Sequence, residues 1–174
     1  MIKINLRLVI VFLVLLLSSS TLSILAVERG VSGDYEYYLK DNNAIICKYT
    51  GIDSMVLVSN ILDGYSVTGV GDLSFSDCEG VETIILPDSV TSIGYKAFMD
   101  CKSLISVNIP NSVTNIGAYT FNNTRISSIN IPADMEKLEP GCDILGNCPE
   151  LISITVDTDN PYYLSDEQGI MKER

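Results

Sequence analysis

Short apolar segments recur along this chain at a fixed interval, and a phenylalanine closes each unit. Phe75, Phe98 and Phe121 are 23 residues apart, and the copies read FSDCEGVETIILPDSVTSIGYKAF and FMDCKSLISVNIPNSVTNIGAYTF. A period of roughly 20–29 residues is typical of stacked single coils, because each coil buries its apolar side against the next. The pattern therefore predicts a solenoid in which the three phenylalanines are buried structural residues.

Each unit is predicted to contain one short strand, over residues 81–86, 104–109, 126–131 and 151–156. The first, fourth and sixth positions are apolar in all four segments, so we expect them to face the core. In three units a proline follows, at Pro87, Pro110 and Pro132, and its missing N–H ends the strand. Irregular or short helical segments then return the chain, through Gly94 or Gly117, where only a small residue or a positive φ fits.

The outward positions of such parallel strands line up in columns. We call Thr83, Ser106, Ser128 and Ser153 the hydroxyl column, and Ile85, Asn108, Asn130 and Thr155 the amide column. Two interpretations stay open. The polar groups either hydrogen-bond along a solvated sheet, or they contact a protein or glycan partner. On the second interpretation the candidate binding residues are Thr83, Ser106, Asn108, Ser128, Asn130, Ser153 and Thr155.

The segment before the repeats predicts a terminal cap. Residues 34–51 form two alternating segments around Asp41, Asn42 and Asn43, which is typical of a β-hairpin. We expect Ile45, Cys47 and Tyr49 to share one face of the second strand. A repeat protein needs such a cover because its first coil otherwise exposes the core. The predicted domains are a signal peptide at 1–26, a linker and hairpin cap at 27–52, and the solenoid at 53–174.

The first residues have the order of a secretory signal peptide. Lys3 and Arg7 precede an apolar run at 8–17, and serines and a threonine follow at 18–21. A membrane-spanning anchor needs roughly 20 largely apolar residues, and this run ends earlier. We therefore expect cleavage, after Ser20, Ser23 or Ala26, and a secreted or cell-surface protein. Contact with a membrane is expected only through an uncleaved leader.

Charge excludes one class of partner. The chain has 11 basic and 22 acidic residues, and without the leader nine basic residues remain, which gives a net charge of −13. No window clusters lysine and arginine, so we expect no nucleic-acid partner. An acidic surface keeps an exported protein soluble, and the alternative is an acidic recognition face.

The five cysteines are expected to pack rather than react. Cys78 and Cys101 lie three residues after Phe75 and Phe98, and Cys148 lies three after Leu145. This spacing predicts a ladder of small apolar thiols, against the alternatives of disulfide formation or metal binding. If any pair forms a disulfide, Cys142 and Cys148 are the expected pair, because they share one loop.

The sequence predicts no catalytic residue, cofactor or metal site. It contains no histidine, which excludes every mechanism that needs an imidazole. Asp157, Asp159, Asp166 and Glu167 are the candidates for carboxylate chemistry, but their polar turn offers nothing that separates their pKa values. A Ca²⁺ loop would need a glycine and a distal glutamate that this segment lacks.

The repeat unit C-x-x-L-x-x-V-x-I-P-x-S-V-x-x-I-G-x-x-A/T-F, written here from Cys101 to Phe121, resembles the BspA-like (treponemal-type) leucine-rich repeat. The resemblance covers about residues 34 to 170 and implies a leucine-rich repeat solenoid of bacterial or protozoal type. Similar proteins are exported or surface-displayed binding proteins, several of them implicated in attachment to host proteins, and no catalytic residues define the repeat. They usually continue into further repeats, so we expect this solenoid to be truncated at its C-terminus.

The resemblance implies a non-catalytic protein that binds or adheres to an extracellular protein or glycan through its sheet face. The alternative is a structural or assembly module. In that case the open C-terminal coil would join another chain at the edge of residues 152–156, because an unpaired strand edge is a ready template for pairing.

Overall fold

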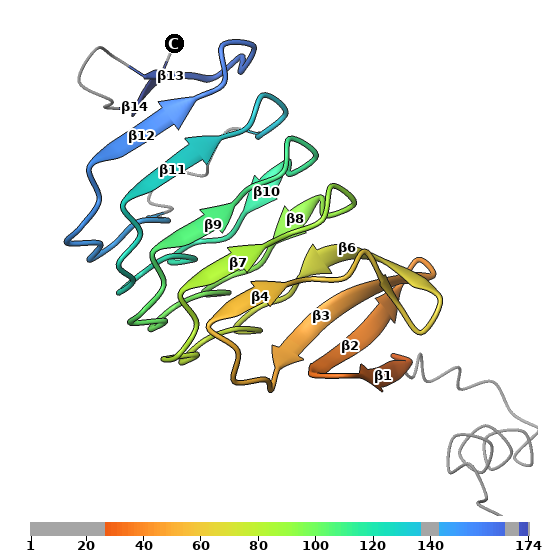
Figure 1. The fold of residues 1–174 in the computed structure, drawn as a ribbon. Coiled ribbons are helices and arrows are strands. Elements are labelled where there is room, and N and C mark those ends of the chain that lie inside the picture. The colour runs from red at the N-terminus through yellow and green to blue at the C-terminus, as the bar shows by residue number, and fades with distance from the viewer. Residues whose placement is uncertain (1–26, 137–142, 166–170, 174) are drawn as a thin grey trace, which may run out of the picture.

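The computed structural model of the chain describes residues 27–136, 143–165 and 171–173, so the predicted leader lies outside the described residues. These residues contain strands, turns and irregular segments, and no helix. The strands are β1 (Arg29–Ser32), β2 (Tyr35–Lys40), β3 (Asn43–Tyr49), β4 (Met55–Leu57), β5 (Ile61–Leu62), β6 (Tyr65–Val70), β7 (Thr83–Ile85), β8 (Ser92–Ile93), β9 (Ser106–Asn108), β10 (Asn115–Ile116), β11 (Ser128–Ile131), β12 (Ser153–Val156), β13 (Tyr163–Ser165) and β14 (Met171–Glu173). Figure 1 shows them rising as a stack of coils.

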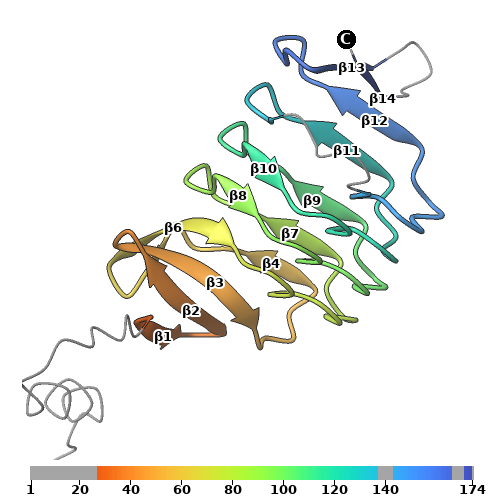
Figure 2. The same ribbon diagram turned by 180° about the vertical axis from the view of Figure 1, so that it is seen from behind.

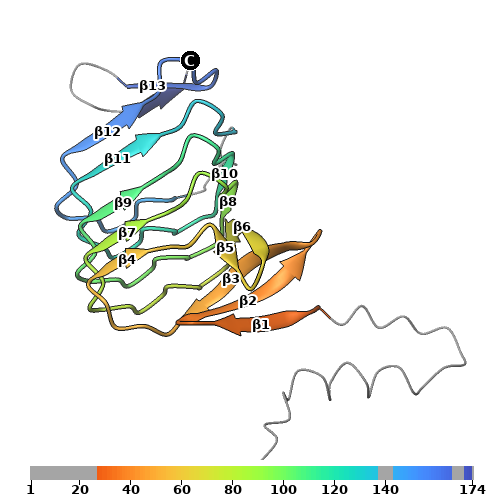
Figure 3. The ribbon, with the colours of Figure 1, turned by 45° about the vertical axis from the view of Figure 1, so that its right-hand side comes forward.

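The coils have two walls, with the core between them (Figure 3). The first wall contains the parallel sheets β4-β7-β9 and β11-β12, and the second wall contains the parallel strands β6, β8 and β10. The predicted leucine-rich repeat solenoid is therefore confirmed. Its described returns are turns and irregular segments rather than short helices.

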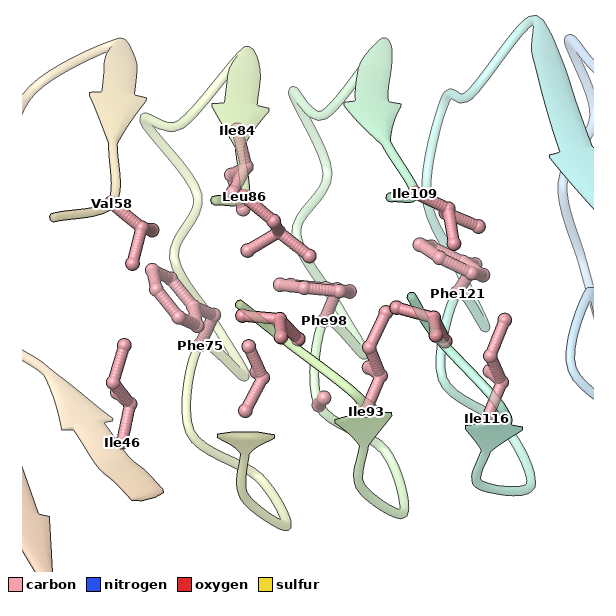
Figure 4. Packing of buried hydrophobic residues seen from close by; sticks show 14 of the residues in the cluster. Ile46, Val58, Phe75, Ile84, Leu86, Ile93, Phe98, Ile109, Ile116 and Phe121 are labelled. Atoms are coloured by element: carbon pink, nitrogen blue, oxygen red, sulfur yellow. The ribbon is translucent and has the colours of Figure 1, made fainter. Parts of the chain in front are cut away.

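A column of aromatic rings runs through the core. The side chains of Phe75, Phe98 and Phe121 are fully buried, and their ring centroids are 5.5 Å apart from coil to coil. Figure 4 shows the three rings in a row between the walls, with Ile93 of the second wall beside them. The predicted burial of these residues is confirmed, and stacking at this distance adds an aromatic contribution to the area buried.

The predicted core positions of the strands also face inward. Val81, Ile84 and Leu86 are at most 2% exposed, and the corresponding residues of the third unit, Ile126, Ile129 and Ile131, are buried as well. The equivalents in the last unit, Leu151, Ile154 and Val156, pack against the core but are only partly buried. This coil lies near the end of the described stack, where fewer neighbours cover it.

The N-terminal hairpin covers the first coil, but one part of the predicted face is wrong. Strands β2 and β3 pair antiparallel, and β3 then pairs with β6 in parallel, so the hairpin extends the second wall (Figure 2). The register between β2 and β3 shifts at this point, so Cys47 has no paired residue on β2. As a result Ile46, not Cys47, joins Tyr49 in the core cluster. The ring of Tyr49 stacks on Phe75 at 5.1 Å and begins the aromatic column.

Two backbone features recur from coil to coil: the preceding coil lies very close to a glycine, and other positions have a positive φ. A Cβ on Gly94 would lie 2.6 Å from the backbone N of Asp72, and a Cβ on Gly117 would meet the backbone of the preceding coil in the same way. Neither glycine has positive φ; the residues two before each phenylalanine do, with values of 57° at Leu73, 55° at Lys96 and 58° at Tyr119. Of the two explanations predicted for the glycines, only the small-residue one holds.

The C-terminal end of the described stack carries a second hairpin. Strands β13 and β14 pair antiparallel beyond β12 (Figure 1). Asn160 anchors the turn before β13 and is 1% exposed. Its Nδ2 donates to the carbonyls of Pro132 and Met135 at 2.8 and 3.3 Å, and its Oδ1 accepts from the N–H groups of Tyr162 and Tyr163 at 2.9 Å. One side chain therefore fastens this end to the preceding coil.

Candidate binding face

The candidate residues lie on the outer surface of the first wall, which we call the outward face. Thr83 lies opposite Ser106, and Ile85 lies opposite Asn108. In the second sheet of this wall, Ser128 lies opposite Ser153, and Asn130 lies opposite Thr155. All seven candidate residues are exposed or half-exposed. The structure thus brings together the hydroxyl and amide columns.

Two apolar side chains extend the columns at the N-terminal end of this face. Met55 pairs in register with Thr83, and Leu57 pairs with Ile85. The side chains of Met55 and Leu57 are 64% and 71% exposed, and that of Ile85 is 38% exposed. Sequence reasoning missed Met55 and Leu57 because the longer first coil obscured its register. The continuous apolar run of residues 55–58 was the available signal, since only Val56 and Val58 can face the core.

The amide column is largely engaged in internal hydrogen bonds. The Oδ1 of Asn108 accepts from the Leu86 N–H at 2.6 Å, and its Nδ2 donates to the Leu86 carbonyl at 3.1 Å. The Oγ1 of Thr155 donates to Oδ1 of Asn130 at 2.9 Å. These groups join successive coils, as the first of the two interpretations expected.

The hydroxyl column differs. Within the described part of the chain, no side-chain hydrogen bond involves Thr83, Ser106, Ser128 or Ser153. The four residues are exposed or half-exposed, and Thr83, at one end of the column, pairs in register with Met55 of the apolar end. A partner that reaches this column can therefore form hydrogen bonds without breaking bonds between coils.

In the cysteine ladder, the side chains of Cys101 and Cys148 bond to backbone carbonyls of the preceding coil. Cys101 is fully buried, whereas Cys78 and Cys148 are partly buried. The Sγ of Cys101 donates to the Phe75 carbonyl at 2.9 Å, and that of Cys148 donates to the Phe121 carbonyl at 3.1 Å. The four cysteines of the described residues are free thiols, and Cys142 lies outside these residues, so the predicted pairing of Cys142 with Cys148 stays a prediction.

The described residues hold no group of three histidine, cysteine, aspartate or glutamate side chains placed to bind one metal ion. Asp157 accepts the N–H of Asp159 through Oδ1 at 3.0 Å, as a turn residue does. Asp166 and Glu167 lie outside the described residues. In the same described part, no helix is long and apolar enough to cross a membrane.

Comparison with known proteins identifies the family. Residues 54–165, more than half of the chain, match the BspA type leucine rich repeat region in six copies. The chain belongs to this family of leucine-rich repeat proteins. No curated protein sequence matches the chain.

Solved structures agree in fold. A leucine-rich repeat protein from Bacteroides capillosus is 24% identical, with a TM-score of 0.64, over 75% of this chain and 99% of the other. The leucine-rich repeat protein of T. pallidum is 21% identical, with a TM-score of 0.56, over 78% and 71% of the two chains. The pneumococcal vaccine antigen PcpA is 15% identical, with a TM-score of 0.51, over 84% and 54%. At these identities the likeness shows the fold alone.

Proposed function

We propose that the chain is an exported, non-catalytic binding protein, secreted or displayed on a bacterial cell surface, whose outward face binds an extracellular protein. The observation that carries this proposal is the exposure of Met55 and Leu57 on the outer side of one strand, next to Ile85. Apolar side chains grouped on a surface and bordered by polar residues mark interaction sites. The neighbouring hydroxyl column supplies hydrogen-bonding groups at the border of this patch.

A protein partner fits this face better than a glycan does. The outward residues of β4, β7, β9, β11 and β12 include aliphatic, hydroxyl and amide side chains and no aromatic ring. Sugars pack the C–H surface of their rings on aromatic side chains, whereas aliphatic patches pack against the apolar centre of a protein interface. Binding to a glycan is therefore the alternative result that the binding assay described below can detect.

The size of the face limits the affinity of a single copy. Parallel strands add about 4.8 Å each, so the five strands of the first wall span roughly 20 Å. A face of this height is at the small end for a stable interface, and several copies on one surface would raise the avidity.

Assembly through the C-terminal edge is the alternative proposal. In the structure, the β13–β14 hairpin contacts β12, and Asn160 fastens its turn to the preceding coil. These contacts favour the outward face over the edge as the site of action. Thr155→Pro tests the alternative, because a proline disrupts β12 and with it the edge that would pair with another chain. If that substitution dissociates an oligomer measured by light scattering, and circular dichroism shows that the chain stays folded, assembly is the function.

The binding proposal is tested by charge substitution on the outward face. We expect Leu57→Lys to weaken binding about tenfold or more, because an ammonium group cannot be buried in an apolar contact without a partner. Ser106→Lys should weaken it as well, by steric block of the hydroxyl column. The assay measures binding of the purified chain to an immobilised panel of extracellular proteins, before and after enzymatic removal of their glycans.

Leu73→Lys is the matched control. Leu73 is 49% exposed, lies outside the first wall, and has the same positive φ as Lys96 one coil later, so a lysine suits its position. This variant should bind as the unmodified chain does. Unchanged binding of Leu57→Lys would contradict the proposed face, and binding lost on removal of the glycans would replace the protein partner with a glycan.

A further inference from the structure

Cys78 and Cys101 occupy equivalent positions in adjacent coils and converge on one carbonyl group. The Phe75 carbonyl accepts the N–H of Cys78 at 3.3 Å and the Sγ of Cys101 at 2.9 Å. The sulfur of Cys101 therefore reaches back from its own coil to the turn that holds Cys78.

The equivalent pair later in the stack, Thr124 and Cys148, indicates the spacing between the side chains of Cys78 and Cys101. Cys148 bonds to the Phe121 carbonyl as Cys101 bonds to that of Phe75, and Thr124 stands where Cys78 stands. The Oγ1 of Thr124 lies 3.6 Å from Sγ of Cys148. Because the coils repeat, the sulfurs of Cys78 and Cys101 are expected at a similar separation, which is compatible with the side-chain geometry of a disulfide.

The two thiols differ in exposure and acidity. Cys101 is fully buried, and Cys78 is partly buried. Interaction with the Cys78 side chain and burial raise the pKa of Cys101 well above its usual value. The thiolate is the reactive form of cysteine and must also be within reach of the external disulfide, so Cys78, the more exposed thiol, attacks first.

We propose that Cys78 and Cys101 form a disulfide between adjacent coils by exchange with a low-molecular-weight disulfide. The Cys78 thiolate attacks one sulfur of that disulfide, its S–S bond breaks, and one thiolate leaves and takes up the proton that Cys78 released. The Cys101 sulfur then attacks Sγ of Cys78, and the second thiolate leaves with the proton of Cys101. Two protein thiols are oxidised and one external disulfide is reduced to two thiols.

Peptide mapping of the whole chain tests this proposal. The chain is treated with oxidised glutathione, alkylated, and cut with trypsin at Lys48, Lys96 and Lys102, which separates residues 49–96 from 97–102. We expect these two peptides to be joined by a disulfide. Recovery of both as separate alkylated peptides, or only as glutathione adducts, would overturn the proposal.

Two variants test the order of attack. In Cys101→Ser, the exchange reaction should stop once one glutathione is bound to Cys78, because the second thiol is missing. In Cys78→Ser, Cys101 should react far more slowly, because it is buried. If Cys101 of that variant takes up glutathione as fast as Cys78 does in Cys101→Ser, the assignment of Cys78 as the attacking thiol is wrong.

Thr124→Cys tests the spacing by adding a thiol. In a Cys142→Ser background, which leaves Cys148 as the single thiol of its tryptic peptide, it places a thiol opposite Cys148 in the geometry of the Cys78–Cys101 pair. Oxidised glutathione should then join the peptide of residue 124 to that of Cys148. Absence of this cross-link in the folded variant would overturn the inference from the ladder spacing.

We also expect the oxidised unmodified chain to melt about 10 °C above the reduced chain, and equal melting would exclude a stabilising cross-link.

Discussion

At the scale of residues, the contact between coils depends on a few side chains with different physical roles. The phenylalanine rings fill the space between the walls, and Phe98 lies between Phe75 and Phe121 with both centroids at 5.5 Å. Asn108 and Asn160 satisfy backbone groups of neighbouring coils. Burial of apolar area and satisfaction of buried polar groups thus act at separate positions, and each can be tested by one substitution.

Phe98→Ala should lower the free energy of unfolding by about 3–5 kcal/mol, because it leaves a cavity and removes two ring contacts. This is a large part of the stability of a domain of this size. Tyr95→Ala is the control, since Tyr95 is 41% exposed, and it should cost about 1 kcal/mol or less. Urea unfolding measures both, and equal losses for the two variants would contradict the central role of Phe98.

Asn160→Ala should lower the free energy of unfolding by about 2–3 kcal/mol, because buried carbonyl and N–H groups lose their partners. Asn160→Asp is the more specific test. Its carboxylate can still accept from the N–H groups of Tyr162 and Tyr163 but cannot donate to the carbonyls of Pro132 and Met135. We expect the aspartate variant to unfold at lower urea than the unmodified chain at pH 7, and equal midpoints would show that the two donated bonds contribute nothing.

At the scale of elements, the features that recur in each repeat unit could be predicted from the sequence, and the features outside the repeat could not. The strands, their inward positions and the buried phenylalanines follow from one period and the alternation of side chains. The stacking of Tyr49 on Phe75 was missed, because the aromatic column continues into a hairpin whose register shifts at Cys47. Met55 and Leu57 were missed because the first coil departs from the period. The segments that depart from the repeat therefore include the end of the stack and the apolar part of the candidate site.

The hairpin cap should make stability fall at high pH. Burial, together with the charges of Tyr49, Asp34 and Asp53, raises the pKa of Tyr35 from 10.0 to about 12. The folded chain then holds the phenol proton more tightly than the unfolded chain does, so this contribution is complete below pH 10 and is lost between about pH 10 and 12. The melting temperature should fall across this window, and less steeply in Tyr35→Phe. Identical slopes would contradict the assignment to Tyr35.

At the scale of the whole molecule, the surface of the first wall and the surface beyond the second wall expose different side chains. The first wall presents Met55, Leu57 and Ile85, followed by the hydroxyl column. Beyond the second wall lie the paired rings of Tyr95 and Tyr119, with Nζ of Lys96 at 5.0 and 5.9 Å from their centroids. Both regions have exposed side chains, so the location of a bound partner distinguishes them.

Hydroxyl-radical footprinting of the chain in complex with its bound protein tests the proposed function most directly. Met55, Leu57, Tyr95 and Tyr119 are all exposed enough to be oxidised in the free chain. The proposal predicts that binding protects Met55 and Leu57 and leaves the two tyrosines as reactive as before. Protection of Tyr95 and Tyr119, with unchanged oxidation of Met55 and Leu57, would contradict it.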